Sequence, residues 1–444
     1  NGAQLAWFAD QVNHHQGMQD INGRLYDNIS LGNKSWTPIG AKEVYRGSFD
    51  GNGYTVRGLL VDKADSYAGL FGAIYGTDTQ SIQNLTVDGQ IQCSKTVDYA
   101  GGIVAYIYGK NPSIRNAVIN CHSDVDITLS KVKKNGASAG GIAGYAKYTW
   151  FRQCSNTGDV IIDSVGKGGI RFYTGGLIGN TVSDVSVRQS YNAGFVHAEY
   201  CAGGLVGNVG GSNCQITSCY NSGETSASTY SGGLAGVVSA AAGGSSVSWC
   251  YSSGPVNLEK SGEYLGALFG GTQSGEYANL YAWKRPDQTG RALVGFSSDA
   301  TSPGTFLSDI ELRGDTVLNS LNAGGSYFIH DYLGFQNDFP ILSWQLTLED
   351  LKSGAVTELQ NFVSQEDYTE ENWALVEALI VQGTERIYNS STMDEVKAVL
   401  TETKEAIYQI ESKEEAALKQ LEEKKEEALL ILEQYVDLSL YREA

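Results

Sequence analysis

A five-residue pattern, Gly-Gly-apolar-x-Gly, recurs between residues 68 and 270 and constrains the possible fold more than any other feature of this chain. Full copies lie at Gly140–Gly144, Gly175–Gly179, Gly203–Gly207 and Gly232–Gly236, and degenerate copies lie around Leu70, Ile103 and Leu268. Successive copies are separated by 33, 39, 35, 28, 29 and 34 residues. A constant unit interrupted by loops of varying length predicts a solenoid.

A second pattern follows the first within each repeat and predicts the type of solenoid. It reads Cys-Tyr-Asn-x-Gly or a close variant at Cys154–Gly158, Ser190–Gly194, Cys219–Gly223 and Cys250–Gly254. Each unit therefore holds three short extended pieces in which apolar residues alternate, with no room for a crossover helix. This predicts a mainly β fold, a right-handed parallel β-helix with three strands per rung. We expect its glycines at corners with positive φ, or where the next rung leaves no space for a Cβ atom.

The last hundred residues differ in composition and predict a helical region. Residues 345–444 hold only two of the 54 glycines, and 23 acidic against 9 basic residues give them a net charge of −14 out of −19. Capping boxes begin at Thr347 and Thr392, and apolar residues recur at steps of three and four after each. We expect a three-helix bundle over 347–412. A repeated motif at an offset of 73 residues predicts a second, truncated helical repeat over 413–444.

The ends of a β-helix need covers, because an open rung exposes an unpaired strand edge. Leu5, Phe8, Ala9 and Val12 are spaced for an amphipathic helix over residues 2–13. We therefore expect an N-terminal cap with the first rungs over 1–60, repeats over 61–304, and a mixed cap at the other end of the solenoid over 305–346.

The repeat unit resembles the GLUG repeat of bacterial cell-surface and secreted proteins, and the helical region resembles the FIVAR-type three-helix repeats of Gram-positive surface proteins. Further resemblance lies in Tyr45–Gly53 and in Phe339–Trp344. The resemblance implies an extracellular, cell-wall or cell-surface location. The truncated second helical repeat predicts that the chain is a fragment of a longer protein, without its secretion signal and anchor. GLUG repeats occur in adhesin-like proteins and beside secreted IgA-cleaving metallopeptidases, so the resemblance implies no single activity.

Net charge and motifs exclude several functions. A charge of −19 argues against a nucleic-acid or anionic-membrane partner, and no apolar run approaches the length of a membrane span. No His-Glu-x-x-His zinc motif occurs, and the adjacent His14 and His15 are more simply solvated polar residues than metal ligands. We expect no metal site, no cofactor and no catalytic residue.

The seven cysteines are expected to be buried free thiols. Cys154, Cys219 and Cys250 occupy one repeat position, which Ala117 and Ser190 share when the repeats are aligned. A ladder of small buried residues explains all five. Cys219 and Cys250 lie on adjacent rungs within disulfide range, but ladder side chains point in parallel.

Two sets of residues are candidates for function. Tyr191, Tyr220, Tyr251 and Tyr281 form a repeated position, and we expect a partly exposed ladder there that binds a ligand, although an inward-facing ladder would be core. Asp159, Asp163, Asp184, Glu199 and Glu224 lie on neighbouring rungs, as scattered surface acids or as a source of a catalytic pair. Insertions at 130–139, 166–173 and 210–214 are expected to project as binding loops.

These features favour a monomeric, non-enzymatic fragment of an adhesin-like bacterial surface protein. The β-helix would present a face to a host or environmental glycan or protein, and the helical repeats would act as a stalk. The alternatives are a carbohydrate-active β-helix enzyme of the glycosidase or lyase type, an accessory region of a secreted peptidase, or a purely structural spacer. Two carboxylates that converge in a groove beside aromatic residues would favour the carbohydrate-active enzyme.

Overall fold

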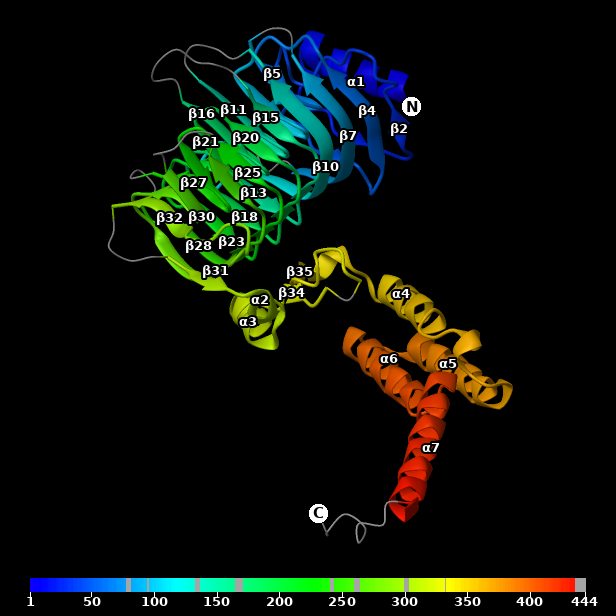
Figure 1. Cartoon of the computed structure of the whole chain (residues 1–444). Coiled ribbons are helices and arrows are strands. Elements are labelled where there is room, and N and C mark those ends of the chain that lie inside the picture. Colours follow the sequence, from blue (N-terminus) through cyan, green and yellow to red (C-terminus); the bar gives the residue numbers. More distant parts are fainter. Residues whose placement is uncertain are drawn as a thin grey trace. The chain divides into compact units, whose positions relative to one another are not determined.

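The computed structural model describes every residue except 77–80, 94–95, 132–135, 164–170, 240–242, 259–263, 299–302, 332 and 436–444. The chain forms two compact units, one made of Asn1–Asp331 and Gln336–Trp344, the other of Tyr332–Phe335 and Gln345–Ala444. The first unit is a stack of parallel strands whose colours run from blue to green along the chain (Figure 1). This confirms the prediction of a parallel β-helix followed by helices.

One turn of the solenoid shows how the repeat folds. It consists of β11 (Ala137–Gly140), β12 (Ala143–Lys147), β13 (Thr149–Arg152), β14 (Ser155–Asn156) and β15 (Val160–Ile162). These pair in parallel with β16 (Phe172–Gly175), β17 (Ile178–Thr181), β18 (Val185–Arg188), β19 (Tyr191–Asn192) and β20 (Val196–Ala198) of the next turn. The three extended pieces expected from the sequence are therefore subdivided into five short strands.

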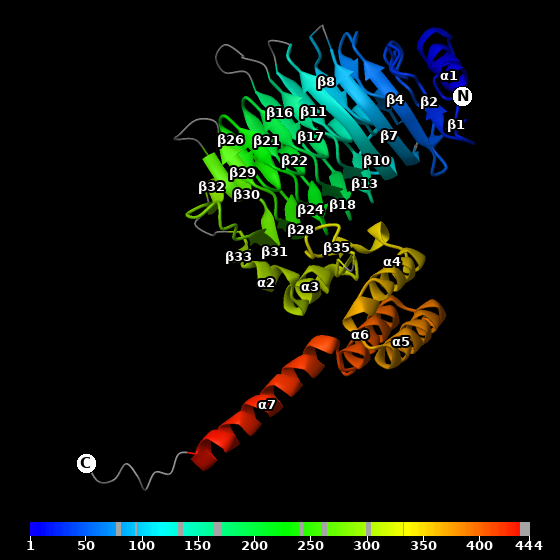
Figure 2. The ribbon, with the colours of Figure 1, turned by 45° about the vertical axis from the view of Figure 1, so that its right-hand side comes forward.

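The same pairing continues along the chain and builds two long sheets. Sheet A contains the strands equivalent to β13, β14 and β15, and sheet B those equivalent to β11 and β12. Sheet B strands lie side by side in Figure 2. Before β11 come β1 (Gly23–Arg24), β2 (Ile29–Ser30), β3 (Phe49–Asp50), β4 (Thr55–Val61), β5 (Tyr67–Ala68), β6 (Phe71–Tyr75), β7 (Ser81–Gln92), β8 (Tyr99–Gly101), β9 (Val104–Tyr108) and β10 (Asn116–Leu129). After β20 come β21 (Cys201–Gly203), β22 (Val206–Val209), β23 (Gln215–Thr217), β24 (Tyr220–Asn221), β25 (Thr225–Ala227), β26 (Tyr230–Gly232), β27 (Ala235–Val238), β28 (Ser246–Ser252), β29 (Val256–Leu258), β30 (Tyr264–Thr272), β31 (Glu276–Trp283), β32 (Ala292–Ser297) and β33 (Thr305–Leu307).

The corners of the rungs correct the expected role of glycine. The left-handed residue between β13 and β14 is Gln153, with φ of 55°, and its equivalents Gln189 and Ser218 have φ of 51° and 52°. A second left-handed corner precedes β13 at Tyr148 and β18 at Asp184. All five of these corner residues carry side chains, although left-handed backbone is uncommon outside glycine. The glycines of the repeat motif therefore serve mainly the second expected purpose, close packing.

An asparagine ladder inside the solenoid explains why the second glycine of the Gly-Gly motif has no Cβ atom. Asn156 Nδ2 donates to Asn192 Oδ1, and Asn192 Nδ2 donates to Asn221 Oδ1, each at 2.9 Å. All three are buried, and each also donates to the carbonyl two residues later. A Cβ atom on Gly176 would lie 2.2 Å from Asn192 Cγ and 2.1 Å from the Gly204 carbonyl oxygen. The motif glycine and the motif asparagine are thus one packing unit.

The cysteine ladder exists, but one of its predicted members was wrong. Register places Cys121 opposite Cys154, because His122 pairs with Ser155. Ala117 instead pairs with Trp150. Each ladder thiol donates to the carbonyl two residues before it, as Cys219 Sγ does to Thr217 at 3.1 Å. All seven cysteines are buried free thiols, as expected.

Burial of these thiols predicts a loss of stability in alkali. Desolvation raises the pKa of Cys154 from 9.0 to about 12, and it also raises the pKa values of Cys121 and Cys219. As pH rises past 9, the unfolded chain loses thiol protons that the folded chain keeps, so unfolding becomes easier. Between pH 9 and its raised pKa, each such thiol lowers the free energy of unfolding by up to about 1.4 kcal/mol per pH unit. Denaturant unfolding at pH 7, 9 and 10.5 should show full stability at pH 7 and a falling free energy of unfolding above pH 9.

Cys154→Ser provides the control, because Ser190 already occupies the equivalent position. This variant should lose less stability between pH 9 and 10.5 than the parent. Thiol titration of the parent at pH 8 should find the native cysteines unreactive, and all seven reactive after denaturation. An equal alkaline loss in both proteins would mean that the thiols do not control it.

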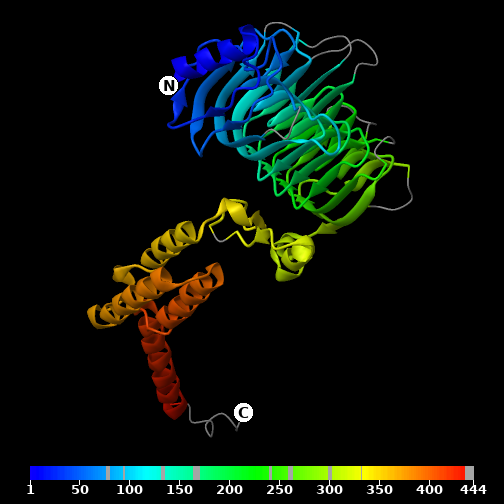
Figure 3. The same ribbon diagram turned by 180° about the vertical axis from the view of Figure 1, so that it is seen from behind.

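The expected N-terminal helix is present as α1 (Gly2–His14), with Asn1 in a capping box. Leu5, Ala9 and Val12 are buried in the same core as Leu25 and Ile29 of the first turn. The helix lies at the end of the stack where the first strands are (Figure 3). Residues 2–13 therefore cap the first rung as the apolar spacing predicted.

Residues 305–344 do not simply cover the opposite end of the stack, which corrects another expectation. They include α2 (Asp309–Arg313), α3 (Asp315–Leu321), a 3-10 turn at Asn322–Gly324, and the antiparallel pair β34 (Phe328–Ile329) and β35 (Ile341–Leu342). Their apolar side chains pack on the side of sheet A, over tyrosines from several turns. Trp344 at the end of this segment donates from Nε1 to the Gln189 carbonyl, at 2.8 Å. We call residues 305–344 the strap.

The second unit is helical. Its bundle consists of α4 (Leu348–Gln360), α5 (Glu370–Asn389) and α6 (Met393–Tyr408), with Thr347 and Thr392 as the predicted capping residues. Two 3-10 turns, Ser343–Gln345 and Gln365–Asp367, precede α4 and α5. Buried residues such as Leu359, Val376 and Ile407 follow the apolar spacing read from the sequence. Next comes α7 (Lys413–Tyr435), and the end of the predicted truncated repeat lies outside the described residues.

Candidate functional site

Three of the four predicted ligand-binding tyrosines stack in succession, and the fourth, Tyr281, is the register partner of Tyr251, but the strap packs over all of them. Tyr191 stacks on Tyr220 with centroids 4.9 Å apart, and Tyr220 on Tyr251 at 5.1 Å. Tyr220 and Tyr251 are 1% and 0% exposed, while Tyr191 and Tyr281 are half-buried in the same cluster. The ladder faces outward from sheet A, yet its rings are packing surface for residues 305–344. The expectation of a partly exposed ladder is therefore wrong for its two central members.

A different set of half-buried tyrosines lies on sheet B, and the repeat pattern alone did not single it out. Tyr106 and Tyr145 stack at 4.7 Å, and Tyr99 contacts both rings. A second group further along contains Tyr230 and Tyr264, stacked at 4.8 Å. The sequence does contain a pattern that indicates this set, because Tyr99, Tyr173 and Tyr230 each lie at the same position shortly before a Gly-Gly pair.

Rings stacked in this way cover part of one another's faces. Burial, with smaller effects from neighbouring tyrosines, raises the pKa of Tyr106 to about 12. A tyrosine hydroxyl is already neutral near pH 7, and this shift keeps that of Tyr106 a neutral hydrogen-bond donor well into alkali. A sugar ring stacks on an aromatic face, so this surface is less suited to sugar stacking than an isolated exposed ring.

The best candidate site is a groove on sheet A that contains an isolated exposed ring, that of Trp150. The groove has a volume of about 530 Å³ and crosses β13, β18 and β23. Trp150 of β13 is 45% exposed there. The groove is lined by Arg115, Ile119, Trp150, Phe151, Arg152, Asp184, Ser186, Arg188, Asn213 and Gln215. Three arginines against one carboxylate make it basic, although the chain is strongly acidic.

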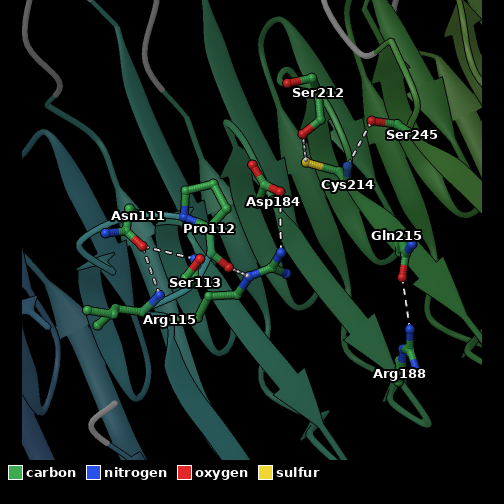
Figure 4. Close-up of polar contacts among 11 residues, drawn as sticks. Asn111, Pro112, Ser113, Arg115, Asp184, Arg188, Ser212, Cys214, Gln215 and Ser245 are labelled. Carbon is green, nitrogen blue, oxygen red and sulfur yellow. Dashed lines mark hydrogen bonds and ion pairs between the residues drawn. The ribbon is translucent and has the colours of Figure 1, made fainter. Parts of the chain in front are cut away.

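One arginine of the groove is held and neutralised by its neighbours. Arg115 Nη2 lies 3.3 Å from Asp184 Oδ1, and Arg115 Nε donates to the Pro112 carbonyl at 2.7 Å (Figure 4). Asn111 Oδ1 accepts the Ser113 backbone N–H and so fixes the turn that carries Arg115. The Arg115 guanidinium lies 5.5 Å from the centre of the Trp150 ring. This contact positions the indole within the groove.

The other two arginines face each other across adjacent strands. Arg152 and Arg188 are register partners in β13 and β18. Arg188 Nη2 donates to Gln215 Oε1 at 2.8 Å, as Figure 4 shows, and its Nε donates to Ser186 Oγ at 3.0 Å. Both partners are neutral. The sequence carried a signal here, because Arg-Gln precedes the second repeat motif at both Arg152 and Arg188.

The five predicted acidic residues do not gather in this groove. Asp184 lines it and pairs with Arg115, whereas Asp159 and Glu224 precede β15 and β25, and Asp163 and Glu199 follow β15 and β20. Asp159 Oδ1 accepts the Phe195 backbone N–H at 3.0 Å, and Glu224 Oε1 accepts from Asn257 at 2.7 Å. The groove lining thus supplies a single carboxylate, already paired, which suits binding better than acid–base catalysis.

The remaining predictions concern metal, membrane and loops. Among the described residues, no group of three His, Cys, Asp or Glu side chains is placed to hold a metal ion, and His14 and His15 both lie near Asp10. Within those residues no helix has the length and apolarity to cross a membrane. Parts of the insertions at 130–139 and 166–173 lie outside the described residues, while 210–214 contributes Asn213 to the groove.

Comparison with known proteins gave a distant structural match. No family model and no curated protein matches this sequence. A crystal structure from Bacteroides ovatus, described as a candidate immunoglobulin A1 protease, aligns with a TM-score of 0.44 and 17% identity, covering 73% of this chain and 86% of that chain. A likeness this weak carries no argument about function.

Proposed function

We propose that this chain is a non-enzymatic, surface-exposed binding module of an adhesin-like bacterial protein. Its groove on sheet A holds a host or environmental glycan or protein ligand, and the helical unit acts as a stalk. The observation that carries the proposal is the groove itself, in which an exposed tryptophan lies beside two arginines that have no carboxylate partner in the part of the chain that the structure describes. Under this proposal the module is extracellular and acts as a monomer.

A glycan array combined with a hydrolysis assay tests this proposal. We expect binding of one group of glycans without turnover. Release of products from a bound glycan would instead favour the carbohydrate-active enzyme, with Asp184 as the first carboxylate to examine. A chain that binds neither glycans nor host surface proteins would be a structural spacer.

Trp150→Ala should weaken binding to the selected glycans by about tenfold or more, because the exposed indole supplies the stacking surface of the groove. Affinities measured by calorimetry on parent and variant check this. Trp7→Ala is the matched control, since Trp7 is 59% exposed on α1 and does not line this groove. Equal affinities for parent and Trp150→Ala would place the ligand elsewhere, and the tyrosines of sheet B would be examined next.

A further inference from the structure

The arginine pair of the groove is unfavourable for folding and needs another explanation. Arg152 and Arg188 lie directly opposite each other on strands about 4.8 Å apart, and both line the same groove. Like charges placed opposite each other in a sheet are destabilising. Arg188 bonds to the neutral Ser186 and Gln215, and the Arg152 guanidinium has no ion-pair partner among the described residues. Two positive charges are thus left uncompensated at one place.

The spacing of the groove residues indicates what would compensate these charges. Trp150 and Arg152 are two residues apart on one strand face, a separation of about 6.6 Å. A carboxylate accepts hydrogen bonds from two guanidinium groups, and a pyranose ring stacks on an indole. Neutral side chains such as Gln215 and Asn213 can bond sugar hydroxyls. Arg115 is already neutralised by Asp184, so it orients the indole and adds little net charge.

We propose that the groove binds a carboxylated sugar, a uronic or sialic acid residue of a glycan, with its carboxylate between Arg152 and Arg188 and its ring against Trp150. This deepens the proposed function and rests on it. The neutral hydrogen bonds to Arg188 hold its guanidinium ready for the anion without cancelling its charge. The acidic surface elsewhere on the chain makes this basic groove the favoured place for such a ligand.

Pairs of probes that differ only in the carboxylate test the proposal. Calorimetry on the full chain would compare tetragalacturonate with its methyl ester, and 3′-sialyllactose with lactose. At least one acidic probe should bind about tenfold or more tightly than its uncharged partner, because charge-assisted hydrogen bonds are lost in the latter. The difference should shrink when salt rises from about 0.05 to 0.5 M, since the groove is open to solvent.

The double variant R152Q/R188Q should abolish the preference for the acidic probe while its melting temperature stays equal or rises, because the repulsion has been removed. R57Q is the matched control, as Arg57 lies on β4 and does not line the groove. Retained preference in R152Q/R188Q would overturn the inference. So would binding of tetraglutamate as tightly as the acidic sugars, since the site would then be a general anion site.

The failures of the two proposals can be told apart. Equal binding of acidic and uncharged probes, weakened by Trp150→Ala, would overturn the carboxylate inference and leave the glycan-binding function standing. Absence of binding to every glycan on the array would overturn the carboxylate inference, and absence of binding to host surface proteins as well would overturn the proposed function.

Discussion

Replacing Gly176 by alanine is expected to destabilise the solenoid by about 3 kcal/mol or more, one of the largest effects of a single methyl group in this chain. The added Cβ atom would lie 2.1 Å from the Gly204 carbonyl oxygen of the next rung and 2.2 Å from Asn192 Cγ. Neither neighbour can move away freely. Gly204 donates its backbone N–H to Gly232, and Asn192 is bonded to Asn156, Asn221 and the Gly194 carbonyl.

Thermal and denaturant unfolding of Gly176→Ala and Gly243→Ala would measure this effect. Gly243 is the matched control, because its φ is not in the left-handed region and a Cβ atom added there would have no neighbouring atom within 4 Å. Gly243→Ala should change the free energy of unfolding by less than about 0.5 kcal/mol. Similar stabilities for both variants would show that adjacent rungs separate easily, and that the Gly-Gly motif is not a packing requirement.

The repeat motif was sufficient to predict the β-helix because its physical cause is local to each rung. The glycine that excludes a Cβ atom recurs in every full unit. The side chain that fills the space is an asparagine in three of these units and Ser252 in the fourth, so the sequence displays the contact several times. The cysteine ladder was placed one member wrongly at Ala117, because β10 runs as one long strand without the glycine turn that marks other units. Its true member, Cys121, becomes evident only from strand pairing.

The fate of the tyrosine ladder could not be predicted from the repeats. Whether Tyr220 and Tyr251 face solvent depends on the strap, which is distant in the sequence: Pro340, which accepts the hydrogen bond of Tyr251, is 89 residues away from it. Trp344 shows the precision of this packing. It stacks on His122 and on Tyr191, over the position between them where the ladder holds the small residue Ser155.

The candidate groove was only partly predictable, for a related reason. The Arg-Gln pairs at Arg152 and Arg188 mark equivalent positions, and strand alternation places them on one face. Arg115 enters the groove from the turn after β9, and no repeat pattern predicts that it meets Asp184 or Trp150. Asp184 was a candidate acid only because it lies on a rung next to those of the other four. The structure adds its ion pair with Arg115, which gives it a role in shaping the groove.

Replacing Tyr251 by alanine is expected to cost about 3 to 5 kcal/mol, concentrated in the attachment of the strap. Tyr251 is fully buried, stacks on Tyr220, and contacts Phe328 of β34 with centroids 6.1 Å apart. Its hydroxyl donates to the Pro340 carbonyl. Removal of the ring opens a cavity between the strap and sheet A without touching the interior of the solenoid, whose hydrogen bonds remain.

Hydrogen exchange would separate this local effect from global unfolding. In Tyr251→Ala, amides of residues 305–344 should exchange faster while those of β12, β17 and β22 stay protected. Tyr251→Phe keeps the ring and loses only the hydrogen bond to Pro340, so its cost should be about 1 kcal/mol with the strap still attached. If exchange in 305–344 is unchanged in Tyr251→Ala, the strap is held by other contacts, such as Trp344 on Tyr191, and the ladder is not its main anchor. Because the strap buries the tyrosines first predicted to bind ligand, its release in Tyr251→Ala would also expose the remaining rings. Ligand binding to the groove around Trp150 should be the same in Tyr251→Ala as in the parent.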